Sequence, residues 1–130
     1  WDVGANFDFI RSKIDFRTAP KGRTDGTFTK FDSLDDKMDN VYYHMQFIKF
    51  GFGRATRDAS RQIQNRRRTR DEALKLVRQY DDEFPKTHFP DSLDYLGMGE
   101  PEFVEIVDMH RNPEIWNFKG SRWKLRYPPA

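Results

Sequence analysis

Apolar residues recur at helical spacing along most of the chain, and this pattern predicts an all-α protein. The clearest stripe alternates four and three residues apart and consists of Leu34, Met38, Val41, Met45 and Ile48. It predicts a long helix that begins at Asp32 or Ser33, because either side chain can accept hydrogen bonds from free backbone N–H groups. Gly51 is the expected end of this helix, since glycine readily adopts the left-handed conformation of a C-terminal cap.

Shorter patterns predict further helices at about residues 7–14, 55–64, 69–80, 91–96 and 100–112. Asn6 is placed to cap the first of these, and Ala59 and Ile63 are expected on the inner face of the second. Thr69 and Glu72 have the spacing of a capping box, in which each side chain bonds to the backbone N–H of the other. We therefore expect a compact bundle of about five short helices.

The two ends of the chain differ from this helical pattern. Residues 116–125 alternate apolar and polar positions around a Lys-Gly-Ser turn, which is typical of a small C-terminal hairpin. The alternative is that Trp116 and Trp123 anchor this tail on the helices. Residues 18–30 are rich in Pro, Gly, Thr and charge, which is typical of a loop. We therefore divide the chain into a short N-terminal helix with an extended connection, residues 1–30, and a helical domain, residues 31–130.

Aromatic side chains are the main candidates for the core. Only 36% of the 130 residues are hydrophobic, but 15% are aromatic, and 12 of these are Phe. Burying one aromatic ring removes about 150–250 Å² from water, so a few rings can replace many aliphatic side chains. The composition therefore predicts one folded domain with a real core.

Charge and cysteine content exclude several classes of site. The net charge is only +2, whereas a protein that binds nucleic acid non-specifically usually has a larger excess of positive charge. The chain has no cysteine, which excludes disulfides, thiolate metal sites and cysteine nucleophiles. No apolar run approaches the roughly 20 residues of a membrane span, and no signal-peptide pattern opens the chain. We expect a soluble cytoplasmic protein, and the opening Trp1 indicates a piece of a longer chain.

The turn between the first long helix and the next one is the main candidate for binding an anion. Its glycines precede a helix start, where free backbone N–H groups and the helix dipole favour phosphate. Basic side chains surround it and could add charge and bidentate hydrogen bonds. The candidate phosphate- or substrate-binding residues are Lys49, Gly51, Gly53, Arg54, Arg57 and Arg61. The alternative is a structural helix–turn–helix corner with solvated arginines.

Other residue types give weaker signals. Arg66, Arg67 and Arg68 form a second basic cluster that could reach phosphates of a nucleic acid, but a solvated loop is the better interpretation. His44, His88 and His110 lie in separate elements without the spacing of metal ligands, so we expect no metal site. No pair of carboxylates stands out as catalytic.

Several ordered blocks resemble one protein family. The run YHMQFIKFGFGRATRDASRQI, followed by TRDEAL and YDDEFP, is similar to the C-terminal portion of the N-acetyl sugar amidotransferases of lipopolysaccharide and O-antigen biosynthesis. The later segments Tyr95-Leu-Gly-Met, Arg111-Asn-Pro and Trp123-Lys124-Leu125 look similar too. The resemblance covers about residues 27–126.

The resemblance implies a part of a larger enzyme. Complete members are ATP-pyrophosphatase-type amidotransferases, whose N-terminal domain carries a Ser-Gly-Gly-x-Asp-Ser phosphate loop and adenylates a sugar N-acetyl group with ATP and Mg²⁺. Ammonia from a partner glutaminase then replaces the adenylate and leaves an acetamidino group. These 130 residues contain neither that loop nor the family's cysteine pairs. We therefore expect a helical domain that is inactive alone, needs no cofactor itself, and helps to hold the nucleotide-sugar or pyrophosphate.

Two alternatives belong to other classes of function. An all-α nucleic-acid-binding module would use Arg57, Arg61 and the cluster at residues 66–68, although the low net charge makes nucleic acid an unlikely partner. A docking domain would recruit the glutaminase through exposed aromatics such as Trp116 and Trp123.

Overall fold

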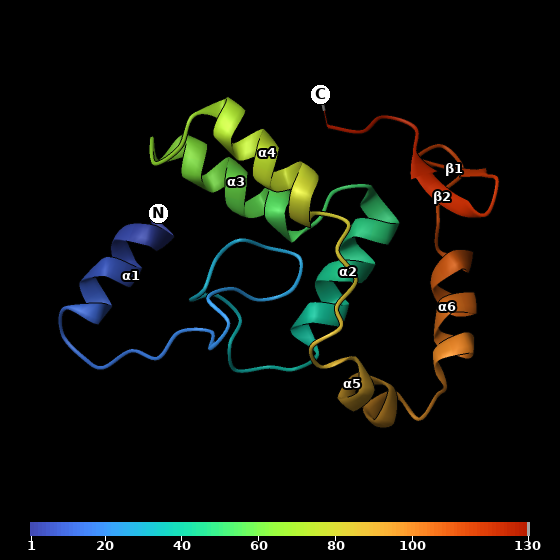
Figure 1. Ribbon diagram of the computed structural model, residues 1–130, viewed down its shortest axis with the longest axis horizontal. Coiled ribbons are helices and arrows are strands. Elements are labelled where there is room, and N and C mark those ends of the chain that lie inside the picture. The colour runs from blue at the N-terminus through green and yellow to red at the C-terminus, as the bar shows by residue number, and fades with distance from the viewer. Residues whose placement is uncertain (130) are drawn as a thin grey trace.

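The computed structural model describes residues 1–129, which form six helices and one two-stranded hairpin (Figure 1). This confirms the predicted all-α fold with a small C-terminal hairpin. The elements in chain order are α1 (Val3–Arg11), α2 (Asp39–Phe50), α3 (Arg54–Gln64), α4 (Arg70–Tyr80), α5 (Phe89–Leu96), α6 (Glu100–Met109), β1 (Trp116–Lys119) and β2 (Arg122–Leu125).

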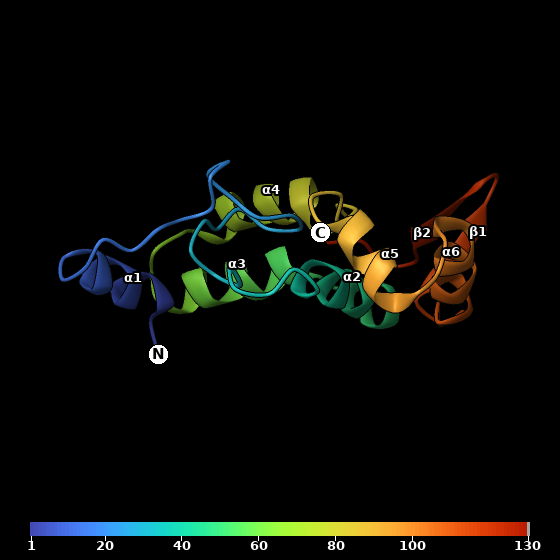
Figure 2. The same ribbon diagram turned by 90° about the horizontal axis from the view of Figure 1, so that it is seen from below.

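Helix α2 lies in the middle of an elongated molecule. Helices α3 and α4 form a pair on one side of α2, while α5, α6 and the hairpin lie on the other side (Figures 1 and 2). The strands pair antiparallel, with Trp116 opposite Leu125 and Phe118 opposite Trp123. This register puts all four of these apolar side chains on one face of the hairpin.

The main core joins α2 to α5, α6 and β1. Its buried members are Val41, Phe47, Ile48, Phe89, Phe103, Val107 and Trp116. Aromatic rings meet edge to face in this core, as between Phe47 and Trp116 at 5.3 Å and between Phe89 and Phe103 at 5.1 Å. Such contacts stabilise a core beyond the area that they bury, so the aromatic composition does build this half of the molecule.

A smaller core holds α3 against α4. Ala59, Ala73 and Val77 are its buried members, and Phe28 from the preceding loop packs against them. Small side chains allow the two helices to approach closely. Ile63, which we expected on the inner face, is 39% exposed. That prediction was wrong because the loop and alanines fill the interface.

Helix α2 begins at Asp39, and the predicted start at Asp32 or Ser33 is wrong. Asp32 instead accepts hydrogen bonds from arginines of α3 through its carbonyl and its carboxylate. Ser33 has a φ of 51°, which does not belong to a helix. Leu34, part of the predicted stripe, is consequently 40% exposed.

Helix α1 lies earlier than its apolar spacing predicts. It begins at Val3, where the Asp2 side chain accepts from the Ala5 N–H at 3.0 Å, so the cap is Asp2 and not Asn6. It ends at Arg11, which leaves Ile14 outside the helix and 56% exposed. Phe7 is the buried anchor, stacked on Phe31 at 4.3 Å.

The loop of residues 18–30 is bound to the helices by carboxylates. Asp58 of α3, itself buried, accepts from the Thr27 hydroxyl at 2.6 Å and the Thr29 hydroxyl at 3.3 Å. Glu83 accepts from both terminal nitrogens of Arg23 at 2.7 and 2.6 Å. This hydrogen bonding to Arg23 is the main reason why the pKa of Glu83 is lowered. The loop is therefore an integrated part of the helical domain.

Candidate functional site

The predicted anion-binding turn already holds an anion of the protein. The Asp81 carboxylate, at the end of α4, accepts from the Gly53 N–H at 2.8 Å and from the Thr56 N–H at 2.8 Å. It also accepts from the Thr56 hydroxyl at 2.7 Å. A Cβ on Gly53 would lie 2.6 Å from the Asp81 carbonyl oxygen, so only glycine fits there. Asp81 thus fills the place at the start of α3 where a phosphate would bind.

Gly51 ends α2 as expected, in the left-handed conformation with a φ of 76°. Its Cα faces the hairpin: a Cβ there would lie 2.7 Å from the Ile115 side chain and 3.3 Å from that of Leu125. The turn therefore packs closely against the C-terminal segment and does not open into a free cradle.

Two of the predicted arginines are engaged inside the protein. Arg54 is 1% exposed, donates to the Asp32 carbonyl at 2.6 Å and lies over the Tyr43 ring. Burial lowers the pKa of Arg54, against the opposing effect of Asp58 and Asp32. Arg57 donates to the Asp32 carboxylate at 2.6 Å and to the Tyr43 hydroxyl at 2.8 Å. Burial opposes its charge, but Asp58, Tyr43 and Asp32 together raise its pKa.

Lys49 and Arg61 are the exposed members of the predicted site. Lys49 lies over the exposed Phe50 ring, and Arg61 makes no ion pair among residues 1–129. Substrate binding by the six-residue set stays a prediction, but in this structure its glycines and two of its arginines serve the α2–α3–α4 junction.

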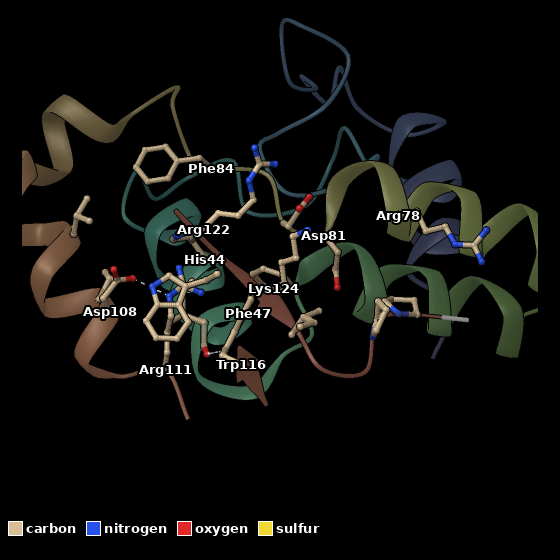
Figure 3. Close-up of a pocket in the computed structure, with 18 of the residues that line it drawn as sticks. His44, Phe47, Arg78, Asp81, Phe84, Asp108, Arg111, Trp116, Arg122 and Lys124 are labelled. Atoms are coloured by element: carbon tan, nitrogen blue, oxygen red, sulfur yellow. Dashed lines mark hydrogen bonds and ion pairs between the residues drawn. The ribbon is translucent and has the colours of Figure 1, made fainter. Parts of the chain in front are cut away.

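A large cleft of about 890 Å³ is formed by α2, α4, α6 and the hairpin (Figure 3). His44, Trp116 and Arg111 lie toward one end of it, and Arg78 of α4 lies toward the other. Its floor is apolar and includes Phe47, Ile48, Phe103 and Val107. Four separate segments of the chain therefore build one site.

Trp116 forms part of the floor and belongs to the core. It is 4% exposed, and its indole N–H donates to the Ile48 carbonyl at 2.6 Å. The expectation that Trp116 is an exposed docking residue is wrong, because this hydrogen bond and the edge-to-face contact with Phe47 hold it inside.

Arg111 forms a fixed cationic layer over this aromatic floor. Its guanidinium lies 4.5 Å from the Trp116 ring centre and 5.4 Å from that of Trp123. Its Nε donates to the Asp108 carboxylate at 2.8 Å. Cation–π contacts of this kind hold an arginine in place, so Arg111 presents a positive charge with little freedom to move.

His44 is neutral at physiological pH. Burial lowers its pKa to about 4, and the positive charge of Arg111 adds to the effect. Its Nδ1 and the indole nitrogen of Trp123 are buried without a hydrogen-bond partner among residues 1–129. The cleft therefore carries unused hydrogen-bonding capacity in its walls.

Three further cations line the cleft and are exposed. Arg78 comes from α4, and Arg122 and Lys124 come from β2, where they share one face of the strand. None of the three side chains makes a hydrogen bond or ion pair within the described residues. Figure 3 places Arg122 and Lys124 between the His44 end and the Arg78 end. Free cations over an apolar floor can bind phosphate beside a sugar or base.

The cations of β2 that line the cleft could have been noticed in the sequence, although the hydrophobic periodicity does not indicate them. Residues 119–126 contain Lys119, Arg122, Lys124 and Arg126 without a single acidic residue. Strand alternation predicts that the side chains of Arg122 and Lys124 lie on the face of β2 opposite to Trp123. Only the fold shows that residues of α4 and α6 line the same cleft.

The second basic cluster is partly neutralised. Arg67 pairs with Asp2 at 2.8 Å, and Arg68 donates to the Gln62 side chain at 2.6 Å. These contacts weaken the interpretation of the cluster as a nucleic-acid interface. Among residues 1–129 no group of His, Asp and Glu could hold a metal ion, and no helix is long and apolar enough to cross a membrane.

Comparison with known protein families gives a match over most of the chain. The family model described as "LPS biosynthesis protein WbpG-like, C-terminal domain" matches residues 25–127. No curated protein matches the chain.

Proposed function

Because the chain belongs to the family of WbpG-like C-terminal domains of LPS biosynthesis proteins, we propose that it serves an ATP-dependent amidotransferase. In this scheme the enzyme converts a sugar N-acetyl group to an acetamidino group for O-antigen synthesis in the cytoplasm. An N-terminal domain of the same protein binds ATP and Mg²⁺ and adenylates the acetamido oxygen. Ammonia from a glutaminase subunit then displaces AMP. The ordered sequence blocks that resemble these enzymes support this reaction.

The role proposed for this domain is to hold the nucleotide-sugar. One observation carries it: Arg122 and Lys124 line the large cleft, and neither side chain makes an ion pair among residues 1–129. A nucleotide-sugar bears two phosphate charges, which two cations on one strand face can meet. The apolar floor with Trp116 and Phe47 suits a sugar ring or a base. No catalytic role is assigned to a residue here.

The test is a titration of the chain with UDP-N-acetylglucosamine, followed by amide and indole NMR shifts. We expect shifts at His44, Trp123 and β2. The double variant Arg122→Ala/Lys124→Ala should weaken binding at least tenfold, since each charge-assisted hydrogen bond contributes about 1.5–3 kcal/mol. Lys119→Ala is the matched control, because Lys119 is an exposed cation of the same hairpin outside the cleft.

The same titration separates the cleft from the predicted turn. Shifts confined to residues 49–61, with a loss of binding in Lys49→Ala/Arg61→Ala, would return the site to the turn. If neither region responds at millimolar ligand, the domain does not hold the nucleotide-sugar and this part of the proposal fails.

A further inference from the structure

Charge is segregated along the molecule. Residues 54–78, which span α3 and α4, contain nine Arg and Lys against three Asp and Glu. Residues 91–114, which span α5 and α6, contain seven Asp and Glu against one Arg. The two helix pairs lie on opposite sides of α2 in both views (Figures 1 and 2). The low net charge therefore conceals a basic side and an acidic side.

Many of these charges have no ion-pair partner in the part of the chain that the structure describes. On the basic side the exposed cations without an ion pair among residues 1–129 are Arg61, Arg66, Arg68, Arg70, Lys75 and Arg78. On the acidic side the exposed carboxylates without one are Asp94, Glu100, Glu102, Glu105 and Glu114. The two sides thus present six cations and five carboxylates, of opposite sign, that have no ion pair among the described residues.

The basic side also has a hollow for apolar groups. A groove of about 310 Å³ lies along α3 and α4, with the buried Ala59, Ala73 and Val77 in its lining. Residues 51–52 and the C-terminal Tyr127 and Pro129 also line it. Its rim includes Phe52, which is 45% exposed, and Arg70. A concave apolar surface with a charged rim is the usual form of a docking groove.

The acidic side has exposed apolar groups that such a groove could accept. Tyr95 of α5 is 80% exposed and Met109 of α6 is 70% exposed. Aromatic and methionine side chains are enriched in protein interfaces. Tyr95 directly follows Asp94 in α5, and Met109 lies one helical turn after Glu105 in α6. The two apolar groups therefore share their helices with free carboxylates, as the groove shares its helices with free cations.

We propose that two copies of this chain associate, with the α5–α6 side of one copy packed on the α3–α4 groove of the other. Opposite charges would steer the copies together and fix their orientation. The two surfaces lie toward opposite ends of the elongated molecule (Figures 1 and 2). In the proposed dimer the two copies lie antiparallel along their long axes, so that each α5–α6 side meets the α3–α4 side of the other copy and the pair closes with two-fold symmetry. The proposal is independent of the ligand of the cleft.

Charge reversal on each side tests this pairing. One variant combines Arg70→Glu with Lys75→Glu, and the other combines Asp94→Lys with Glu105→Lys. Arg70 begins α4 and Asp94 lies in the last turn of α5, so the new charge at each agrees with the helix dipole and folding should persist. Circular dichroism checks that both variants fold.

The measurement is sedimentation equilibrium in about 20 mM and about 300 mM NaCl, since salt screens exposed charges. We expect the unmodified chain to dimerise more tightly at low salt, and each double reversal to weaken the dimer at least tenfold. An equimolar mixture of the two variants should dimerise again, because two acidic surfaces then meet two basic ones.

The control is Arg17→Glu with Lys21→Glu, which makes the same change in net charge as Arg70→Glu with Lys75→Glu, at exposed cations outside both surfaces. This variant should dimerise like the unmodified chain. The proposal would be overturned if the chain stays monomeric at low salt up to about 200 μM, because an affinity that weak is well below what specific recognition gives. A dimer that no reversal weakens, or a mixture that stays monomeric, would overturn it too.

Discussion

At the scale of single residues, Asp81 connects the end of α4 to the start of α3. Its carboxylate meets two backbone N–H groups and one hydroxyl, all within 2.8 Å. The first N–H groups of a helix have no partner within the helix, and here a residue 28 positions away from Gly53 supplies one. The contact therefore joins tertiary structure to helix capping.

We predict that Asp81→Ala lowers the free energy of unfolding by about 2–4 kcal/mol, because it removes a cap and leaves buried donors unpaired. Asp82→Ala is the control: Asp82 is exposed and makes no side-chain hydrogen bond within residues 1–129, so its loss should change stability by less than about 0.5 kcal/mol. Urea denaturation measures both. Equal effects of the two substitutions would contradict the capping role.

His44 makes stability depend on pH. The pKa of His44 falls from 6.5 in the unfolded chain to about 4 in the folded one. Between these values the unfolded chain binds a proton that the folded chain does not, so the free energy of unfolding falls as pH falls through this window. The loss approaches about 3 kcal/mol, since each pKa unit corresponds to about 1.4 kcal/mol.

Denaturation curves at pH 7, 6, 5 and 4 measure this dependence. The same curves for His44→Leu contain the contribution of the carboxylates, so the difference between the two proteins isolates that of His44. The variant should lose the part of the slope that lies between about pH 6.5 and 4. His110→Gln is the control: it removes an exposed imidazole and leaves His44 in place, so the variant should keep the slope that His44 causes. A slope that is unchanged in His44→Leu would show that other groups cause it.

At the scale of elements, one hydrogen bond fastens the hairpin to α2. The Trp116 indole donates to the Ile48 carbonyl, which lies in the last turn of α2, where carbonyls have no partner within the helix. Gly51 packs on Ile115 and Leu125 beside it. Together these contacts fix the hairpin as one wall of the cleft.

We predict that Trp116→Phe costs about 1–2 kcal/mol more than Trp123→Phe. Both remove an indole from the same hairpin, but only the Trp116 N–H has a hydrogen-bond partner within the described residues. Thermal unfolding of the two variants makes the comparison. A larger cost at Trp123 would mean that packing of the hairpin outweighs this bond.

The sequence predicts those elements best whose stabilising contacts lie within a few residues of each other along the chain. The capping box of α4 forms as expected, because Thr69 and Glu72 are three residues apart and need no other partner. The hairpin also follows from its own alternation. The start of α2 could not be predicted, because Asp32 is taken by Arg54 and Arg57 more than twenty residues later.

The candidate site was harder to predict for the same reason. The basic turn was visible as a cluster in the sequence, but Asp81 and Asp32, both distant along the chain, engage its groups. The cleft brings α2, α4, α6 and β2 together, and no spacing within one segment reveals such a meeting. The cations of β2 were visible, while their neighbours were not.

At the scale of the whole molecule, contacts cross the division proposed at residue 30. Thr27 is fully buried and Thr29 nearly so, and both bond to Asp58 of α3. Helix α1, by contrast, is held by the exposed Arg67–Asp2 pair and by the Phe7 stack. The loop is therefore tied more firmly to the helical domain than α1 is.

We predict that a chain of residues 18–130 folds and unfolds cooperatively, whereas a chain of residues 31–130 loses at least about 3 kcal/mol. The second truncation leaves the buried Asp58 carboxylate without its hydroxyl donors, which is costly. Urea denaturation of both fragments provides the measurement. Equal stability would place the boundary at residue 30 after all.

The close fit of Gly53 against Asp81 has a consequence for how related sequences can diverge. A side chain at position 53 would strike the Asp81 backbone, and a change at position 81 would strand the Thr56 hydroxyl and two N–H groups. A substitution at either position alone would thus destabilise the fold. We therefore expect Gly53, Thr56 and Asp81 to be inherited as a unit, and to covary in the branches where one of them has changed.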